Sequence, residues 1–225
     1  MNATPQPPSL PAPFPAAVRV EETVEDRNRL TAAFRIILAV PHLLLVGGPM
    51  AATLSWTWTS RGGLTYEWGA GGGVLGAAVA VVALIAWFAI LFTGRYPEGL
   101  RSLAVYYLRW RVRAVAYTAL LRDEYPPFGE GAYPVELELV EPKVERRRLT
   151  VAFRIILAIP HILVVWALGV AWALTTLIAW VSILFTGRYP PPLYHFGVGV
   201  LRWNIRVEAY LLLLFDDYPP FSLRA

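Results

Sequence analysis

The chain contains the same sequence block twice, and this duplication restricts its fold more than any other feature. Residues 29–42 read RLTAAFRIILAVPH and residues 148–161 read RLTVAFRIILAIPH, so twelve of fourteen positions are identical at an offset of 119. A second block, LIAWFAILFTGRYP at 84–97, returns as LIAWVSILFTGRYP at 177–190, at an offset of 93. The offsets differ because the first copy carries a 26-residue insertion, which falls within Leu43 to Ala83. Repetition of this kind predicts two equivalent structural units.

The 93-residue offset continues towards the end of each copy. LRWRVRAVAY at 108–117 matches LRWNIRVEAY at 201–210, and the motif YPPF closes the copies at 125–128 and 218–221. The duplication therefore covers nearly the whole chain.

Three segments follow from these boundaries. We expect a first repeat over residues 18–128 and a second repeat over residues 133–221. Residues 1–17 contain six prolines and lack the basic and apolar regions of a signal peptide. This composition predicts a disordered tail.

These blocks resemble the bacterial membrane family DUF4389, a domain of unknown function whose pattern runs RLT..FRiiLAiPH, LFTGRYP, LRW..RV.AY and D.YPPF. Both copies match this pattern. The resemblance implies a bacterial integral membrane protein and no specific activity, because none is assigned to the family. The first copy differs from the second by its insertion and by Ser102 and Tyr106, which stand where the second copy has His195 and Gly199.

Composition independently favours a membrane protein. Hydrophobic residues make up 56% of the chain and charged residues only 16%, with a mean hydropathy of +0.49. A soluble protein with an aromatic core is the alternative. Of the 20 basic residues, 19 are arginine and Lys143 is the exception. Guanidinium groups suit anionic headgroups because they bind phosphate through two donors at once.

Each repeat is expected to contain a transmembrane helical hairpin. Crossing about 30 Å of hydrocarbon takes roughly 20 helical residues. Residues 30–92 offer two such stretches on either side of an aromatic, glycine-rich loop at 56–73. Residues 149–185 hold two crossings only if the chain turns tightly near 167–171.

The third apolar stretch of each repeat, Leu100–Leu121 or Leu193–Phe215, contains arginines at its centre. Each would cost about 2.5–3.5 kcal/mol in the middle of the bilayer. We therefore expect an amphipathic helix that lies along the cytoplasmic interface, with its apolar face on the acyl chains. A buried span with paired arginines is the alternative.

The distribution of basic residues predicts the topology. If each repeat crosses twice, Arg61 alone faces outward and the other 19 basic residues lie on the inner side or at the inner ends of helices, as the positive-inside rule requires. The predicted location is the bacterial inner (plasma) membrane, with four crossings and both termini cytoplasmic.

Two short segments read as strands. Val135–Val140 alternates apolar and charged residues, which is typical of a half-buried strand, and Val18–Val20 is its short equivalent. The two segments are expected to pair. The predicted fold is an all-α membrane protein of two tandem repeats, each a transmembrane hairpin plus an interfacial amphipathic helix, with short cytoplasmic β-strands.

Each repeat carries one set of basic side chains that are candidate ligands for a headgroup or another anion. They are Arg35, His42, Arg95, Arg109 and Arg113 in the first repeat, and Arg154, His161, Arg188, Arg202 and Arg206 in the second. Ionisable groups at membrane depth indicate function by default. The alternative is structural: the arginines anchor helix ends at the headgroups, and the histidines bond to a carbonyl freed by the neighbouring proline.

Signatures of enzymes do not accompany these residues. The sequence has no HExxH, GxSxG or P-loop motif, and three histidines without cysteine make a metal site unexpected. No catalytic residue and no cofactor are therefore predicted. The first functional hypothesis is a non-enzymatic membrane scaffold or accessory subunit, and the alternative is a protein that binds or transports anionic lipid or a small solute.

The expected partners are the lipid bilayer, anionic lipids within it, and either a membrane protein or a second copy of the chain. Nucleic acid is not expected, because the arginines interleave with long apolar runs.

Overall fold

The computed structural model of the chain describes residues 14–49, 56–59, 65–68, 73–140 and 146–224. Within them the elements follow one another as β1 (Ala16–Val20), α1 (Arg29–Ala33), α2 (Arg35–Val46), β2 (Trp56–Thr59), β3 (Thr65–Trp68), α3 (Gly73–Thr93), α4 (Glu98–Thr118), β4 (Val135–Leu139), α5 (Arg148–Ala152), α6 (Arg154–Thr186) and α7 (Pro191–Leu211).

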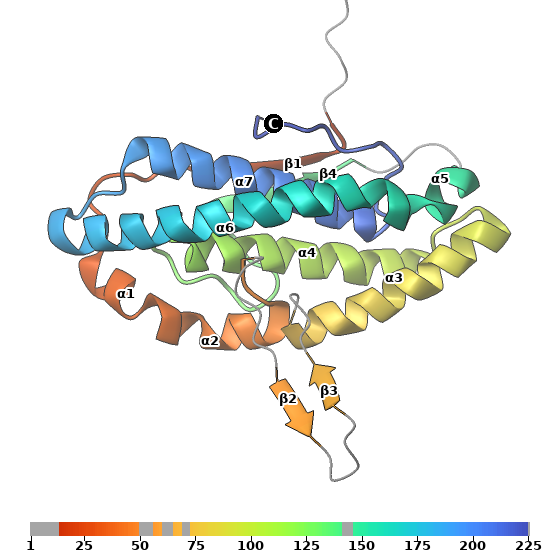
Figure 1. Cartoon of the computed structure of the whole chain (residues 1–225), viewed down its shortest axis with the longest axis horizontal. Coiled ribbons are helices and arrows are strands. Elements are labelled where there is room, and N and C mark those ends of the chain that lie inside the picture. Colours follow the sequence, from red (N-terminus) through yellow and green to blue (C-terminus); the bar gives the residue numbers. More distant parts are fainter. Residues whose placement is uncertain (1–13, 50–55, 60–64, 69–72, 141–145, 225) are drawn as a thin grey trace, which may run out of the picture.

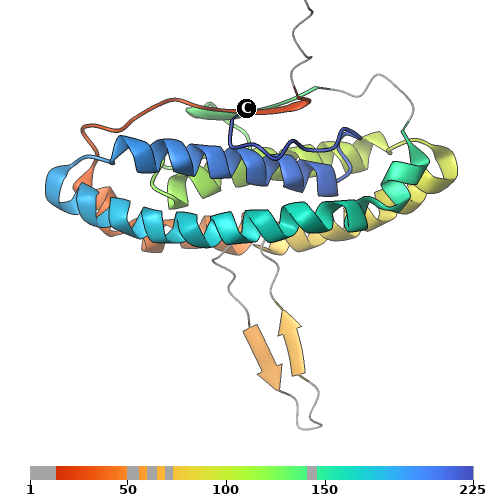
Figure 2. The ribbon, with the colours of Figure 1, turned by 45° about the horizontal axis from the view of Figure 1, so that its top comes forward.

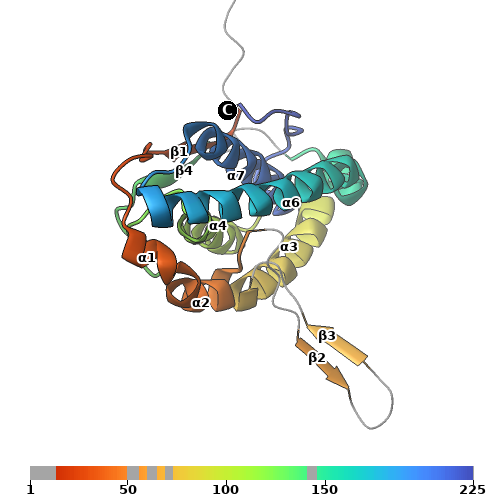
Figure 3. The same ribbon diagram turned by 60° about the vertical axis from the view of Figure 1, so that its left-hand side comes forward.

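The long helices form two layers, and a small sheet forms a third (Figures 1 and 2). Helices α2, α3 and α6, with the short α1 and α5, make up an outer layer. Behind it, α4 and α7 lie side by side, and β4 and β1 pack on α4 and α7 respectively. Figure 3 shows α4 in the middle of the molecule, with helices on several sides of it.

The second repeat contains one long helix, α6, in place of the predicted hairpin. It runs without a break for 33 residues, which corresponds to about 50 Å. The prediction of a turn near 167–171 is therefore wrong. Gly169 is the residue there that most disfavours a helix, by about 1 kcal/mol relative to alanine, and it is buried within a helix that packs along α7.

In the first repeat, two helices, α2 and α3, correspond to the single helix α6. We call α6, and α2 with α3, the rods of the two repeats. Val46 ends α2 and Gly73 begins α3, and their counterparts at 165–166 are consecutive in α6. The insertion is therefore residues 47–72, narrower than the interval expected from the sequence. A Cβ atom on Gly73 would lie 2.6–2.7 Å from backbone atoms at the end of α2, so α3 resumes where α2 stops (Figure 1). The hairpin predicted for this repeat is wrong as well.

Inside the insertion, β2 and β3 form an antiparallel pair that was not predicted. The pair projects from the side of the molecule opposite β1 and β4 (Figure 2). The alternating WTWT and TYEW segments on either side of an Arg-Gly-Gly sequence are the signal for this pair. The rest of the loop predicted at 56–73 lies outside the described residues.

Helices α4 and α7 are enclosed rather than spread on a surface. Ten of the 21 residues of α4 and thirteen of the 21 residues of α7 are buried, against three of 21 in α3. The prediction that the apolar faces of α4 and α7 rest on acyl chains is wrong. A helical wheel identifies the residues that share a face, but it does not reveal that other elements of the same chain cover that face.

The predicted pairing of the two short strands is confirmed. β1 and β4 are antiparallel, with Val18 opposite Leu137 at the centre. These two residues are separated by 119 positions, the offset of the first repeat block, so each strand meets its own equivalent. β1 begins at Ala16, two residues inside the expected tail, and residues 1–13 of that tail lie outside the described part of the chain.

Reciprocal contacts extend this relation to the helices. The indole nitrogen of Trp87 donates to the Val151 oxygen (2.8 Å), and that of its equivalent Trp180 donates to the Ala32 oxygen (3.0 Å). Each repeat therefore makes the same contact with the other. The two repeats are related by an approximate two-fold axis through the β1–β4 pair, as in a symmetric dimer.

Two helices, α3 and α6, are long and apolar enough to cross a membrane by length and composition, and α2 is apolar but shorter. These helices are the outer layer, so apolar surface is concentrated on one side of the molecule.

Deletion of residues 47–72, which joins Val46 directly to Gly73, should leave the fold intact, because both cut ends of the rod already adjoin. We expect cooperative thermal unfolding and a higher helical signal per residue by circular dichroism. Loss of cooperative unfolding would show that the insertion is part of the folded core.

Candidate functional site

Arg35 on α2 and Arg154 on α6 are buried, and both terminal nitrogens of each guanidinium donate hydrogen bonds. Arg35 donates to Asp123 (2.5 Å) and to the backbone oxygens of Arg122 (2.5 Å) and Tyr117 (3.3 Å). Its guanidinium carbon lies 4.2 Å from the centre of the Tyr117 ring.

The second repeat reproduces this arrangement. Arg154 donates to Asp216 (2.7 Å), Phe215 O (2.8 Å) and Tyr210 O (2.9 Å), and it lies over the Tyr210 ring at 4.3 Å. Because these oxygens belong to the end of α7 and the turn after it, the arginine supplies donors to carbonyls that lack a partner within a helix. Neither guanidinium faces outward.

A second pair of buried arginines, not chosen from the sequence, shares the same carboxylates. Arg27 donates to Asp123 (2.9 Å) and to the Leu120 oxygen (2.5 Å), and Arg146 pairs with Asp216 (3.3 Å) and donates to the Leu213 oxygen. Arg27 and Arg146 are 119 residues apart, two positions before each RLT block, and that spacing is the signal that could have identified them.

Burial lowers the pKa of the Arg27 and Arg146 guanidinium groups, and the neighbouring aspartate opposes that change. Arginine starts from so high a pKa that both groups stay protonated. Each aspartate therefore faces two positive charges.

The two repeat histidines are buried among aromatic rings. The Nδ1 atom of His42 accepts a hydrogen bond from Trp110 Nε1 (3.0 Å), and its ring stacks on Phe128 at 4.5 Å. His161 does the same with Trp203 (3.2 Å) and Phe221 (3.9 Å). The closing YPPF motif thus supplies the ring that covers the histidine. Among the described residues, neither histidine bonds to a carbonyl freed by the neighbouring proline as the structural alternative predicted, and an indole donates to the Nδ1 atom instead.

One polar cluster joins the two repeats and has no symmetric counterpart among the described residues. Arg111 donates to Glu208 (2.7 Å) and to the Val46 oxygen (2.6 Å), and Tyr107 donates to the other Glu208 oxygen (3.1 Å). Burial alone would lower the Arg111 pKa, but Glu208 outweighs it and the pKa is raised. The Val46 carbonyl lacks a helical N–H partner because α2 ends there at the insertion, and Arg111 donates to it instead.

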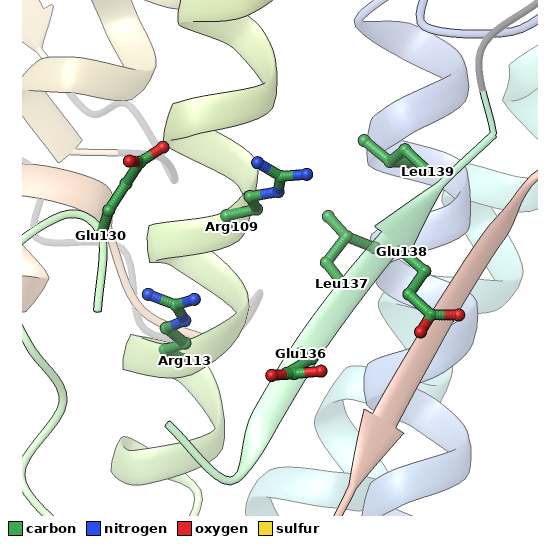
Figure 4. Close-up of a pocket in the computed structure, with 7 residues that line it drawn as sticks. All are labelled: Arg109, Arg113, Glu130, Glu136, Leu137, Glu138 and Leu139. Carbon is green, nitrogen blue, oxygen red and sulfur yellow. The ribbon is translucent and has the colours of Figure 1, made fainter. Parts of the chain in front are cut away.

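The candidate arginines of α4 lie on the side of the molecule that carries β1 and β4. Arg109 and Arg113, one turn apart on α4, line a groove of about 500 Å³ between α4 and β4. Figure 4 shows both guanidiniums directed into this groove, where Glu130 and Glu136 stand on either side. Arg113 donates to the Gly129 oxygen (3.1 Å), whereas no hydrogen bond or ion pair of Arg109 is found within the described residues.

The equivalent groove of the second repeat is closed by the chain itself. Arg202 donates to the Val18 oxygen of β1 (3.1 Å), and Arg206 donates to Ser222 O. Leu223 occupies the space beside Gly199, where an added Cβ atom would come within 2.9 Å of it. The substitution of Tyr106 by Gly199 between the repeats therefore makes room for the C-terminal segment.

The arginines of the two TGRYP motifs, Arg95 and Arg188, are exposed at opposite ends of the rods. The preceding glycines have left-handed φ angles of +75° at Gly94 and +72° at Gly187. Gly187 and Gly94 follow the ends of α6 and α3, and their N–H groups donate to the carbonyl four residues earlier. The TGRYP motif therefore ends each helix at a left-handed glycine.

The predicted site residues therefore divide into three groups. Arg35, Arg154, His42 and His161 lie inside the repeats; Arg109 and Arg113 line an open groove and Arg202 and Arg206 a closed one; Arg95 and Arg188 lie at the ends of the rods. In the part of the chain that the structure describes, no group of three or more His, Asp or Glu side chains is placed to hold a metal ion.

Replacement of Arg35 or Arg154 by alanine should reduce the free energy of unfolding by about 3 kcal/mol, because each change removes one of the two guanidiniums that share a partly buried aspartate and the side-chain donor to two backbone carbonyls. Arg19 is the matched control. Its ion pair with Glu138 is exposed, so Arg19→Ala should cost less than about 1 kcal/mol. Chemical denaturation followed by circular dichroism measures both, and equal effects would refute the structural role.

Comparison with known proteins agrees with this repeated architecture. No curated protein and no solved structure matches the chain. The family model described as "Domain of unknown function (DUF4389)" matches residues 69–129 and 148–222, one segment in each repeat. The first match covers α3 and the second covers all of α6, and both include the TGRYP motif, the enclosed helix and the closing motif. Together they cover more than half of the chain. The chain belongs to the DUF4389 family and carries two tandem copies of its domain.

Proposed function

We propose that this protein is a non-enzymatic membrane module, which embeds the outer layer of helices in one leaflet and presents the opposite side to the cytoplasm as a scaffold or accessory surface. The observation that carries the proposal is the separation of apolar and charged surface onto two opposite sides of one molecule.

The apolar side is formed by the outer layer. Large apolar side chains are exposed along the whole of α6, from Ile155 (68%) through Leu174 (61%) to Phe185 (78%), and along α2 and α3, as at Ile36 (72%) and Leu84 (57%). We call this surface the apolar face. A continuous exposed apolar surface of this extent is characteristic of contact with a membrane or a partner protein.

The opposite side carries the charges. Arg19, Glu136 and Glu138 on β1 and β4 point outward, and the groove with Arg109 and Arg113 opens beside them. β1 and the C-terminal segment lie together on this side (Figure 1). This arrangement supports an orientation in which both ends of the described chain are on the same side of the membrane.

The length of α6 favours helices that lie in the plane of the membrane. At about 50 Å it exceeds the roughly 30 Å thickness of the hydrocarbon core. A crossing orientation would also place β1, β4 and their charges at membrane depth, at about 2.5–3.5 kcal/mol for each charged residue near the centre. In the plane, the apolar face meets the acyl chains and the charged side stays in water. The β2–β3 pair, which projects from the apolar side (Figure 2), then reaches into the bilayer.

The buried arginines of α2 and α6 and the two repeat histidines each have structural partners, which supports a scaffold rather than a catalyst. The interior arginines and histidines bond to aspartates, carbonyls and indoles of the same repeat. Photo-crosslinking from Glu136 in native membranes should trap a membrane protein or a second copy of the chain. A protein that stays monomeric and free of partners there would refute the scaffold proposal.

The orientation predicts one depth for the whole of α6. Single cysteines placed at Ile156, Leu163, Leu174 and Val181 of this cysteine-free chain can carry a fluorophore in reconstituted vesicles. Quenching by lipids that are spin-labelled at different depths should give similar values at all four positions. Glu138→Cys is the control and should stay accessible to aqueous iodide. A progression of depth from one headgroup region to the other along α6 would show that the helix crosses.

A further inference from the structure

The two ends of the apolar face carry exposed arginines that differ from those of the interior. At one end Arg148, from the second repeat, lies against Gly94 of the first, since a Cβ atom on Gly94 would be 3.2 Å from its guanidinium. Arg95 follows Gly94 directly, and Arg147 precedes Arg148. We call Arg95, Arg147 and Arg148 the first rim site.

The two-fold relation produces the same arrangement at the other end. Arg29, from the first repeat, lies against Gly187 of the second, with a corresponding distance of 3.4 Å, and Arg188 follows the glycine. Arg29 and Arg188 form the second rim site. Asn28 stands there at the position of Arg147, so this site has two arginines instead of three.

No ion pair of the five rim arginines is found within the described residues, and all five are exposed. The buried arginines, in contrast, share Asp123 and Asp216. Each rim site therefore holds two or three positive charges whose natural counterion is not a carboxylate of the described chain.

Exposed apolar side chains adjoin both rim sites. Phe92 and Leu149 are 78% and 77% exposed beside the first site, and Phe185 and Leu30 are 78% and 70% exposed beside the second. A phenylalanine and a leucine directed outward next to paired guanidiniums match the chemistry of a phospholipid, whose acyl chain needs apolar contact while its phosphate accepts from arginine.

We infer that the two rim sites bind the phosphate headgroups of anionic phospholipids, one lipid at each end of the apolar face. The inference rests on the proposed function, because it requires the apolar face to lie in the bilayer. It adds a lipid class and a reason for the two-fold arrangement, since each site is complete only when both repeats contribute an arginine.

Native mass spectrometry of the full chain in detergent tests this inference with dioctanoyl phosphatidylglycerol as the probe and dioctanoyl phosphatidylcholine as the neutral comparison. The wild type should retain two phosphatidylglycerol molecules and prefer them over phosphatidylcholine. Each basic residue near an anionic surface contributes about fivefold in affinity, so R95Q/R148Q should weaken one of the two binding events about 30-fold. R29Q/R188Q should weaken the other by the same factor.

The unequal composition of the two sites gives a sharper expectation. The first site should bind about fivefold more tightly than the second, and Arg147→Asn should remove that difference. The matched control is R109Q/R113Q, which removes two arginines from the polar side and should change neither binding event.

Three outcomes would overturn the inference: no preference for phosphatidylglycerol, an equal loss in the R109Q/R113Q control, or displacement by inorganic phosphate at the same concentration as the lipid, which would identify a site for free phosphate. If the depth measurements on α6 hold while the preference is absent, the inference fails alone. If α6 shows a progression of depth, the proposed function fails first.

Discussion

A carboxylate shared by two buried arginines holds each repeat together. Asp123 accepts from Arg27 and Arg35, and Asp216 accepts from Arg154 and pairs with Arg146. The arginines come from the start of the outer layer, while the aspartates and the carbonyls that complete the contacts follow α4 and α7. Because an unpaired charge is costly when buried, these contacts fix the beginning of each repeat to its end. The stacking of the histidine on the phenylalanine of the YPPF motif is a further contact between the beginning and the end of each repeat.

The two-fold relation explains both what is repeated and what differs. Strand pairing at Val18 and Leu137 and the reciprocal indole bonds of Trp87 and Trp180 are contacts that any symmetric pair of repeats can make. The insertion breaks that symmetry at one point by freeing the Val46 carbonyl. Arg111 donates to this carbonyl and is held by Glu208. The equivalent residues of the other repeat are Asn204 and Val115. Because α6 is continuous, it has no free carbonyl at the corresponding point for them to bind.

Placing the polar contacts inside leaves the outer layer free to be apolar. The interior arginines bond to the ends of α4 and α7 and do not interrupt the exposed surface of α2, α3 and α6. The arginines that remain outside gather at the ends of that surface, at Arg95, Arg148, Arg29 and Arg188. A single two-fold operation thus yields one apolar face with a cationic rim at each end.

The sequence by itself determined the duplication, the family and the pairing of the two strands, because each depends on local pattern or on comparison of sequence blocks. It also marked most of the repeated basic residues, although it missed Arg27 and Arg146 as partners of the closing aspartates. Only the tertiary structure decided that α6 continues through Gly169, that α4 and α7 are covered on several sides, and that Arg202 and Arg206 are closed off while Arg109 remains open. The physical reason is that hydropathy and helical periodicity record which residues avoid water, whereas the choice between lipid and another helix as their neighbour depends on contacts between segments as far apart in sequence as β1 and α7.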